Sequence, residues 1–172
     1  VKPYPYYNED VVFENTEAKI TLAGTLTLPN KNGTFPVVIL ISGSGPQDRD
    51  DSFMGHKPFF VLADHLTKQG IGVLRFDDRG HGESTGDFGN ATTEDCSKDV
   101  WSAIAYLKTR NDIDIENSGL IGDSEGGIIA PVAANNSIDV AFMVLLAYTG
   151  VSGAEVSVMQ SNTLRQFPVK DE

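Results

Sequence analysis

The sequence predicts an α/β fold, with a doubly wound and mostly parallel sheet in a single domain of residues 1–172. Three observations carry this prediction. Short apolar runs alternate along the chain with segments whose apolar residues recur at helical spacing, which is the rhythm of βαβ units. Glycine-rich polar loops follow three of the apolar runs, where ligands bind in such sheets. The 172 residues, of which 40% are hydrophobic, suffice for one core and are too few for two.

The first half of the chain contains three expected strands and one helix. Residues Ile20–Leu28 (ITLAGTLTL) alternate apolar and small polar side chains, as a half-exposed strand does. The run Val37–Ile41 (VVILI) is continuously apolar and β-branched, which indicates a strand buried on both faces. Pro58 suits the first turn of a helix that Gly70 can end in a left-handed conformation. Residues 71–76 (IGVLRF) then indicate a second buried strand.

The second half of the chain repeats this alternation. Thr92 and Asp95 resemble a capping box at the start of a helix that runs to about Arg110. Strands are expected at residues 118–122 and 140–147, with a helix over about residues 125–134 between them. One further helix is expected after the last of these strands.

Composition and charge exclude several classes of function. Twenty-four acidic and thirteen basic residues give a formal net charge of −11, which argues against nucleic acid or an anionic membrane as the partner. No apolar run reaches the roughly 18 residues of a membrane span. Asp48, Asp50 and Asp51 lack the later ligands of a calcium loop, so we expect a solvated acidic loop and neither a metal nor a cofactor. The single cysteine, Cys96, lies in a helical pattern and is expected to be a structural thiol.

The first residue bears on localisation. The chain begins with Val1 rather than with an initiator methionine. Such a start fits a processed or engineered polypeptide, and a soluble protein exported with its signal peptide already removed is one expectation.

The stretch IGDSEGG, residues 121–127, has the pattern of a serine nucleophile on a sharp turn. A strand that reverses directly into a helix brings the backbone on both sides of Ser124 into near contact, so Gly122 and Gly126 are needed where a Cβ has no room. Ser124 is then expected in a strained and exposed conformation. A serine hydroxyl attacks carbonyls poorly unless a neighbouring base takes its proton.

Backbone N–H groups near this turn are candidates for an oxyanion hole. The N–H of Glu125 lies at the start of the following helix, whose dipole favours a developing negative charge. The loop after residues 37–41 supplies a second donor, with Ser44 as the first candidate and Gly43 as the alternative. Each such donor contributes about 3 kcal/mol of transition-state stabilisation.

Together these motifs resemble those of the α/β-hydrolases, in particular the serine esterase and acyl-peptidase (prolyl oligopeptidase-like) branch with its G-x-S-E-G-G elbow. Two further loops match in the correct order. SGSGPQDRD, after residues 37–41, is similar to the family's oxyanion loop, and DDRGHGES, residues 77–84, is similar to its D-x-R-G-x-G-x-S loop. The resemblance runs from about Val11 to Val151. It implies an α/β-hydrolase sheet and a serine hydrolase that forms an acyl-enzyme on an ester or peptide-like substrate.

The chain departs from the family in its histidines and beside the nucleophile. In this fold the triad acid and histidine follow the serine, but His56, His65 and His81 all precede Ser124. His56 is a candidate for lining the pocket, while His65 is expected to be structural and His81 to shape its loop. Asp123 stands where many relatives have histidine, and its charge opposes the oxyanion unless it points away or is neutralised.

Neither the triad acid nor the triad histidine is therefore expected in this chain, which the resemblance marks as the N-terminal part of a longer hydrolase that lacks its C-terminal strands and helices. Residues 152–172 would start a cap or the next crossover helix. Residues 140–147 would lie at a sheet edge, and the apolar side chains of residues 37–41 and 118–122 would be partly uncovered, which predicts self-association or a partner in the missing C-terminal segment. The alternative function is a catalytically inert fragment or pseudoenzyme that keeps the binding pocket.

Overall fold

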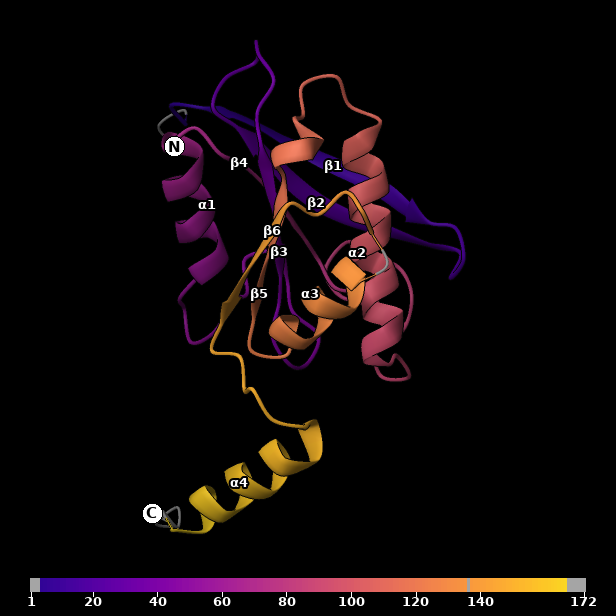
Figure 1. Cartoon of the computed structure of the whole chain (residues 1–172), viewed down its shortest axis with the longest axis vertical. Helices are drawn as coiled ribbons and strands as arrows, with labels where there is room; N and C mark the ends of the chain where they lie inside the picture. The colour runs from indigo at the N-terminus through magenta and orange to yellow at the C-terminus, as the bar shows by residue number, and fades with distance from the viewer. Residues whose placement is uncertain (1–3, 136, 167–172) are drawn as a thin grey trace.

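The computed structural model of the chain describes residues 4–135 and 137–166. These residues form one six-stranded sheet in the order β1-β2-β4-β3-β5-β6 (Figure 1). The strands are β1 (Tyr7–Asn15), β2 (Ile20–Leu28), β3 (Val37–Ile41), β4 (Gly72–Phe76), β5 (Gly119–Asp123) and β6 (Phe142–Leu146). The helices are α1 (Pro58–Lys68), α2 (Thr93–Lys108), the short 3-10 helix η1 (Ile115–Asn117), α3 (Gly126–Asn135) and α4 (Gly153–Gln166).

The sheet is mostly parallel, which confirms the predicted fold class. β3 pairs in parallel with β4 and β5, and β5 pairs in parallel with β6. The pairs β1–β2 and β2–β4 are antiparallel. The strands and helices that the sequence predicted are present, with ends that differ by one or two residues. The predicted capping box of α2 is also present, because Thr92 and Asp95 exchange backbone and side-chain hydrogen bonds.

The strand β1 was not predicted from the sequence. Its buried side chains are Val11, Phe13 and Asn15, and polar or exposed residues alternate with them. Only two apolar residues therefore mark the buried face. The third position holds an asparagine, whose amide donates a hydrogen bond of 2.7 Å to Asp99 of α2. A polar residue at a buried position hides the period-2 pattern on which strand prediction depends.

Helices cover both faces of the centre of the sheet (Figure 1). On one face, Val38 and Leu40 of β3 pack in a cluster with Phe59 of α1. On the other face, Ile39 of β3 packs in the main core with residues of α2 and α3, among them Ile104. The C-terminal ends of β3, β4 and β5 therefore lie between two helical layers, where the loops of the predicted site emerge.

The expectation that residues 37–41 and 118–122 are partly uncovered is wrong. Every side chain of β3 is at most 4% exposed, and Leu120 and Ile121 of β5 are 1% and 6% exposed. α1, α2 and α3 already cover both faces of these central strands, so nothing further is needed to bury them. The uncovered strand is β6, whose five side chains are 36–42% exposed and which lies at the edge of the sheet, beside β5.

The helix α4 lies apart from the sheet (Figure 1). Ser152 and Glu155 exchange hydrogen bonds in a capping box at its start. A helix is thus present where one was predicted, while its role as the start of a cap or crossover stays a prediction, and residues 167–172 lie outside the described part of the chain. Among the described residues, none of the helices has the length and the hydropathy that crossing a membrane requires.

Candidate active site

The turn between β5 and α3 has the strained, tightly packed backbone predicted for the elbow, while Ser124 is partly buried and not exposed as predicted. Ser124 has a positive φ of 51°, a backbone conformation that is strained for a residue with a Cβ. A Cβ on Gly122 would collide with the carbonyl group of Gly126, and a Cβ on Gly126 would collide with the carbonyl oxygen of Ile41 at the end of β3. The N–H of Ser124 donates to the carbonyl of Leu146 in β6 (2.9 Å). Three neighbouring strands therefore fix the position of this serine.

Replacing Gly122 with alanine is expected to destabilise the fold by about 3 kcal/mol or to prevent folding, because the added methyl group overlaps backbone atoms on the other side of the elbow. Gly153→Ala is the matched control, since a Cβ at Gly153 meets no atom within 4 Å. The control should stay within about 0.5 kcal/mol of the parent protein. Urea unfolding followed by circular dichroism measures both values, and equal stability of the two variants would contradict the close packing at the elbow.

The expected oxyanion donors lie around this turn. A Cβ on Gly43 would lie 3.4 Å from the Cβ of Ser124, so the loop after β3 passes directly beside the serine. In the described part of the chain, no hydrogen bond takes up the backbone N–H of Gly43, Ser44 or Glu125. Ser44 is exposed and Glu125 is partly buried. Three N–H groups in the segments that meet at Ser124 are therefore available to a ligand.

Asp123 faces the loop that follows β3 and does not point away from it. Its Oδ2 atom lies 3.7 Å from the position that a Cβ on Gly43 would occupy. Burial raises the pKa of Asp123. Burial, together with the charges of Asp123 and Asp48, also raises the pKa of Asp51. Within the described residues neither Asp51 nor Asp123 has an ion-pair partner, so this side of the site carries negative charge that no cation neutralises.

Asp78, in the DDRGHGES loop, binds both ends of the loop that follows β3. One carboxylate oxygen accepts a hydrogen bond from Ser42 Oγ (2.8 Å), and the other accepts one from the N–H of Gln47 (2.9 Å). The N–H of Asp78 donates in turn to the carbonyl of Gln47 (3.0 Å). Burial raises the pKa of Asp78 to about 6, although both hydrogen bonds favour its charged form. The segment 42–47, which contains Gly43 and Ser44, is thus held at its two ends by one side chain.

Asp77, the preceding residue, has a pKa that is shifted in the opposite direction. It accepts hydrogen bonds from the backbone N–H of Arg49 (2.8 Å), from the Arg49 guanidinium (2.7 Å) and from the N–H of Glu83 (3.0 Å). Burial disfavours its charge, but the hydrogen bonds from Arg49 and from the N–H of Glu83, together with the charge of Arg49, outweigh burial and lower the pKa of Asp77. Gly82 is needed here because a Cβ at that position would lie 2.5 Å from Asp77 Oδ2. Asp77 therefore stays ionised and fixes the two loops to each other.

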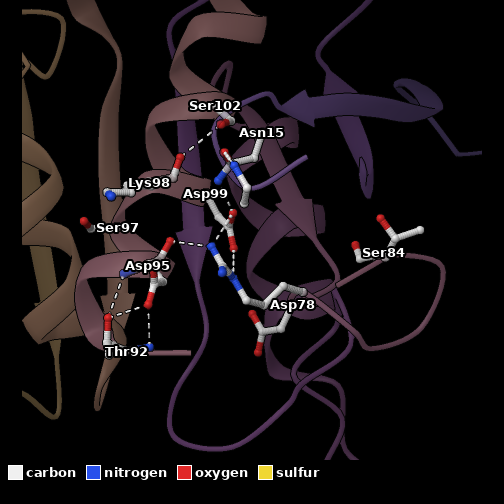
Figure 2. A network of polar contacts seen from close by, with 12 residues as sticks. Asn15, Asp78, Ser84, Thr92, Asp95, Ser97, Lys98, Asp99 and Ser102 are labelled. Carbon is white, nitrogen blue, oxygen red and sulfur yellow. Dashed lines mark hydrogen bonds and ion pairs between the residues drawn. The ribbon is translucent and has the colours of Figure 1, made fainter. Parts of the chain in front are cut away.

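A second polar network joins the DDRGHGES loop to α2 and β1, as Figure 2 shows. Arg79 donates two hydrogen bonds to the carboxylate of Asp99 (2.7 and 2.9 Å) and one to the carbonyl of Asp95 (2.6 Å). Asn15 donates to the same carboxylate. Burial raises the pKa of Asp99, although Arg79 and Asn15 both stabilise its charge. The sequence analysis missed Asn15 and Asp99, for which the only signal was a polar residue within an otherwise apolar stripe.

A small cavity lies beside the loop that follows β3. Its volume is about 20 Å³, enough for one water molecule. The residues around it include Ser42, Asp78, Glu125 and Cys96. Burial raises the pKa of the Cys96 thiol to about 11, so the thiol is protonated at neutral pH and fits the structural role that was predicted for it.

The described residues show no hydrogen bond between a histidine side chain and the serine of the elbow. His56 lies in an exposed turn and exchanges backbone hydrogen bonds with Phe53 (3.0 and 2.8 Å). His65 is exposed on α1. The N–H of His81 donates to the carbonyl of Asp78 (2.9 Å), so the backbone of this residue shapes its loop. The pocket-lining role of His56 stays a prediction.

The acidic loop after β3 is less solvated than predicted. Asp50 forms ion pairs with Arg75 and with Lys57, the latter at 2.9 Å. Arg75 is only 5% exposed. Asp48 accepts hydrogen bonds from the N–H groups of Asp50 and Ser52 and so closes a turn. The physical reason for the difference is the buried guanidinium of Arg75 in β4, which attracts the carboxylate of Asp50 and so holds the loop against the sheet.

Known proteins are similar to this chain over much of its length. A family described as "Serine aminopeptidase, S33" (Hydrolase_4) matches residues 57–159. The esterase EstD of Thermotoga maritima is 31% identical over 134 residues, which are 77% of this chain and 32% of EstD. An acyl transferase of Shewanella woodyi is 32% identical over 131 residues, which are 76% of this chain and 40% of the transferase.

Solved structures extend the likeness to the fold. The esterase Pf2001 of Pyrococcus furiosus matches with a TM-score of 0.75 at 20% identity, over 96% of this chain and 59% of Pf2001. The chain thus spans from about a third to about three fifths of the length of these proteins. Because the family match covers more than half of its residues, the chain belongs to the Hydrolase_4 family of α/β-hydrolases.

Proposed function

We propose that the complete protein is a serine hydrolase in which Ser124 is the nucleophile and an ester or peptide-like bond is cleaved through an acyl-enzyme. The observation that carries this proposal is the strained backbone of Ser124, with a φ of 51° in a turn closed by Gly122 and Gly126. Unfavourable backbone conformations cluster at active sites, where the surrounding structure holds a reactive side chain in place.

The chemistry follows from the groups around the turn. Ser124 Oγ attacks the carbonyl carbon of the substrate while a base takes the hydroxyl proton. The carbonyl oxygen becomes an oxyanion that accepts hydrogen bonds from the N–H of Glu125 and from that of Ser44 or Gly43. Collapse of this intermediate breaks the bond to the alcohol or amine, which leaves with the proton from the base. Water then attacks the acyl group on Ser124, and the acid product is released.

The names of similar proteins and the charge near Ser124 both narrow the class of substrate. EstD and Pf2001 are named as esterases, which supports an ester substrate. Asp51 and Asp123 lie near the oxyanion loop without an ion-pair partner among the described residues. Because like charges repel across a partly desolvated site, an acyl group that is neutral or cationic is favoured over an anionic one.

A second function is supported by the distribution of histidines. The sequence contains three histidines, and none of them follows Ser124. Without a base the serine hydroxyl keeps its proton and remains a weak nucleophile. The 172-residue polypeptide alone is therefore proposed to be a catalytically inert fragment or pseudoenzyme that keeps the pocket.

Hydrolysis of p-nitrophenyl acetate by the complete natural polypeptide that contains these residues tests the first proposal. Ser124→Ala is expected to lower turnover by about 10⁶-fold, whereas Ser157→Ala, an exposed serine of α4, is the control and leaves turnover unchanged. Equal turnover in both variants would refute the role of Ser124. A complete polypeptide without any turnover would favour the second function.

Ser44→Pro is expected to lower the turnover of the complete enzyme by about 10²–10³-fold, because proline lacks the backbone N–H that the oxyanion requires. Ser44→Ala keeps this N–H and changes only an exposed side chain, so its turnover should match that of the parent. Initial rates at saturating substrate measure the effect, with thermal unfolding as the check on folding. Equal losses in the two variants would assign the effect to the side chain, and no loss in either would leave Gly43 as the donor.

A further inference from the structure

The loop that contains Gly43 and Ser44 is connected to the rest of the site mainly by one carboxylate. Ser42 Oγ and the N–H of Gln47 each donate to a different oxygen of Asp78. A carboxylate that accepts at both oxygens fixes the distance between the two donors. The four residues between them, 43–46, include Gly45 with a positive φ of 86° and a Cβ position that meets no atom within 4 Å. Packing at Gly45 therefore does not hold the loop.

We propose that Asp78 is a positioning residue: its carboxylate ties the two ends of the 42–47 loop together and thereby orients the N–H groups of Gly43 and Ser44 for the oxyanion. This inference rests on the proposed function, because it assigns Asp78 to the oxyanion hole of the same site. Asp78 acts through the loop and does not touch the substrate.

The energetics of Asp78 support a positioning role over a stabilising one. Its pKa in the folded chain is about 6, above the ordinary value of 3.8. The folded chain therefore binds more protons at Asp78 than the unfolded chain between these two values, and the contribution of Asp78 to stability falls as the pH rises through this window. At neutral pH the buried charge opposes folding. Because the charge of Asp78 does not stabilise the fold, its two hydrogen bonds are better explained by their effect on the position of the 42–47 loop.

Several other charged groups face Asp78. The charge of Asp99 on α2 raises its pKa and that of His81, in the same loop, lowers it, but both effects are smaller than that of burial. Arg79 and Glu125 line the same small cavity. Protonation of Asp78 replaces one of its two acceptor oxygens by a hydroxyl group, so Ser42 and Gln47 then compete for one full acceptor. The loop should accordingly loosen below a pH of about 6.

The experiment is a pH titration of amide ¹H–¹⁵N signals in the complete polypeptide that contains these 172 residues. The Gln47 amide is expected to shift with a midpoint near the pKa of about 6, and the Gly43 and Ser44 amides should follow with the same midpoint. Asp78→Asn should remove the inflection at all three amides and leave the melting temperature at pH 7.5 unchanged or higher. Asp139→Asn, in an exposed ion pair with Lys108, is the control and should keep the inflection.

Two further variants make the outcome decisive. Ser42→Ala removes one of the two contacts and should shift the Gly43 amide with little change in melting temperature. Ser124→Ala should keep the titration intact, so a failure of the proposed function in the activity assay is distinguishable from a failure of this inference. The inference is overturned if the Gln47 amide has no midpoint between about pH 5 and 7, or if Asp78→Asn keeps the inflection at the Gly43 and Ser44 amides.

Discussion

The 172-residue chain is expected to hydrolyse an activated aryl ester about 10⁶-fold more slowly than a comparable enzyme with a complete triad. This factor corresponds to about 8 kcal/mol of activation free energy. The physical reason is that, among the described residues, no histidine side chain is hydrogen-bonded to Ser124. The hydroxyl proton of Ser124 therefore has no acceptor during the attack. The free N–H groups around the elbow act on the oxyanion and cannot replace the base.

Release of p-nitrophenol from p-nitrophenyl acetate measures this rate, with Ser124→Ala as the matched blank. The two proteins should be indistinguishable within the error of the spontaneous reaction. Turnover at ordinary esterase rates that vanishes in Ser124→Ala would falsify this prediction and would reveal a base within the chain. His56→Ala and His81→Ala would then identify it, since these are the histidines that lie on loops.

Much of the fold could be predicted because several elements carry a strong local signal. β3 reads VVILI and is buried along its whole length, α1 begins at Pro58, and α2 begins at a capping box. β1 gave no such signal, because one of its three buried positions is Asn15, whose amide group donates to Asp99 far along the chain. The covering of β3 and β5 was also mispredicted, since the sequence does not state which face each helix occupies.

The candidate site divides in the same way. The elbow could be predicted because the constraint on Gly122 and Gly126 is local to the turn. The roles of Asp77 and Asp78 could not, although both lie in a recognised motif. The carboxylate of Asp77 contacts Arg49, and its pKa is lowered. The carboxylate of Asp78 contacts Ser42, and burial raises its pKa. Adjacent residues in an irregular loop point in directions that only the folded chain determines.

The two edges of the sheet differ in their protection against pairing with another chain. β1 forms one edge and carries Glu9, Asp10 and Glu14, charges of the kind that discourage such pairing. β6 forms the other edge and reads FMVLL without any charge. Its side chains are 36–42% exposed, on both faces of the sheet. An apolar edge strand with unpaired backbone groups is a template for a further strand.

The isolated chain is therefore expected to self-associate through β6 at micromolar concentration. Pairing of two such edges satisfies backbone groups and removes apolar surface from water, which contributes about 25 cal/mol for each Å² buried. Val144→Lys places a charge in the middle of this strand, at a side chain that is 40% exposed. The substitution is expected to weaken association by at least about tenfold, or about 1.4 kcal/mol.

Sedimentation velocity over a series of concentrations measures this association. Val12→Lys is the matched control, because Val12 is 62% exposed on the edge strand β1 that already carries charges, and it should leave the association constant unchanged. A cooperatively folded, soluble monomer at micromolar concentration with no partner present would contradict the prediction. An oligomer that resists Val144→Lys and dissociates in Val12→Lys would assign the contact to the opposite edge of the sheet.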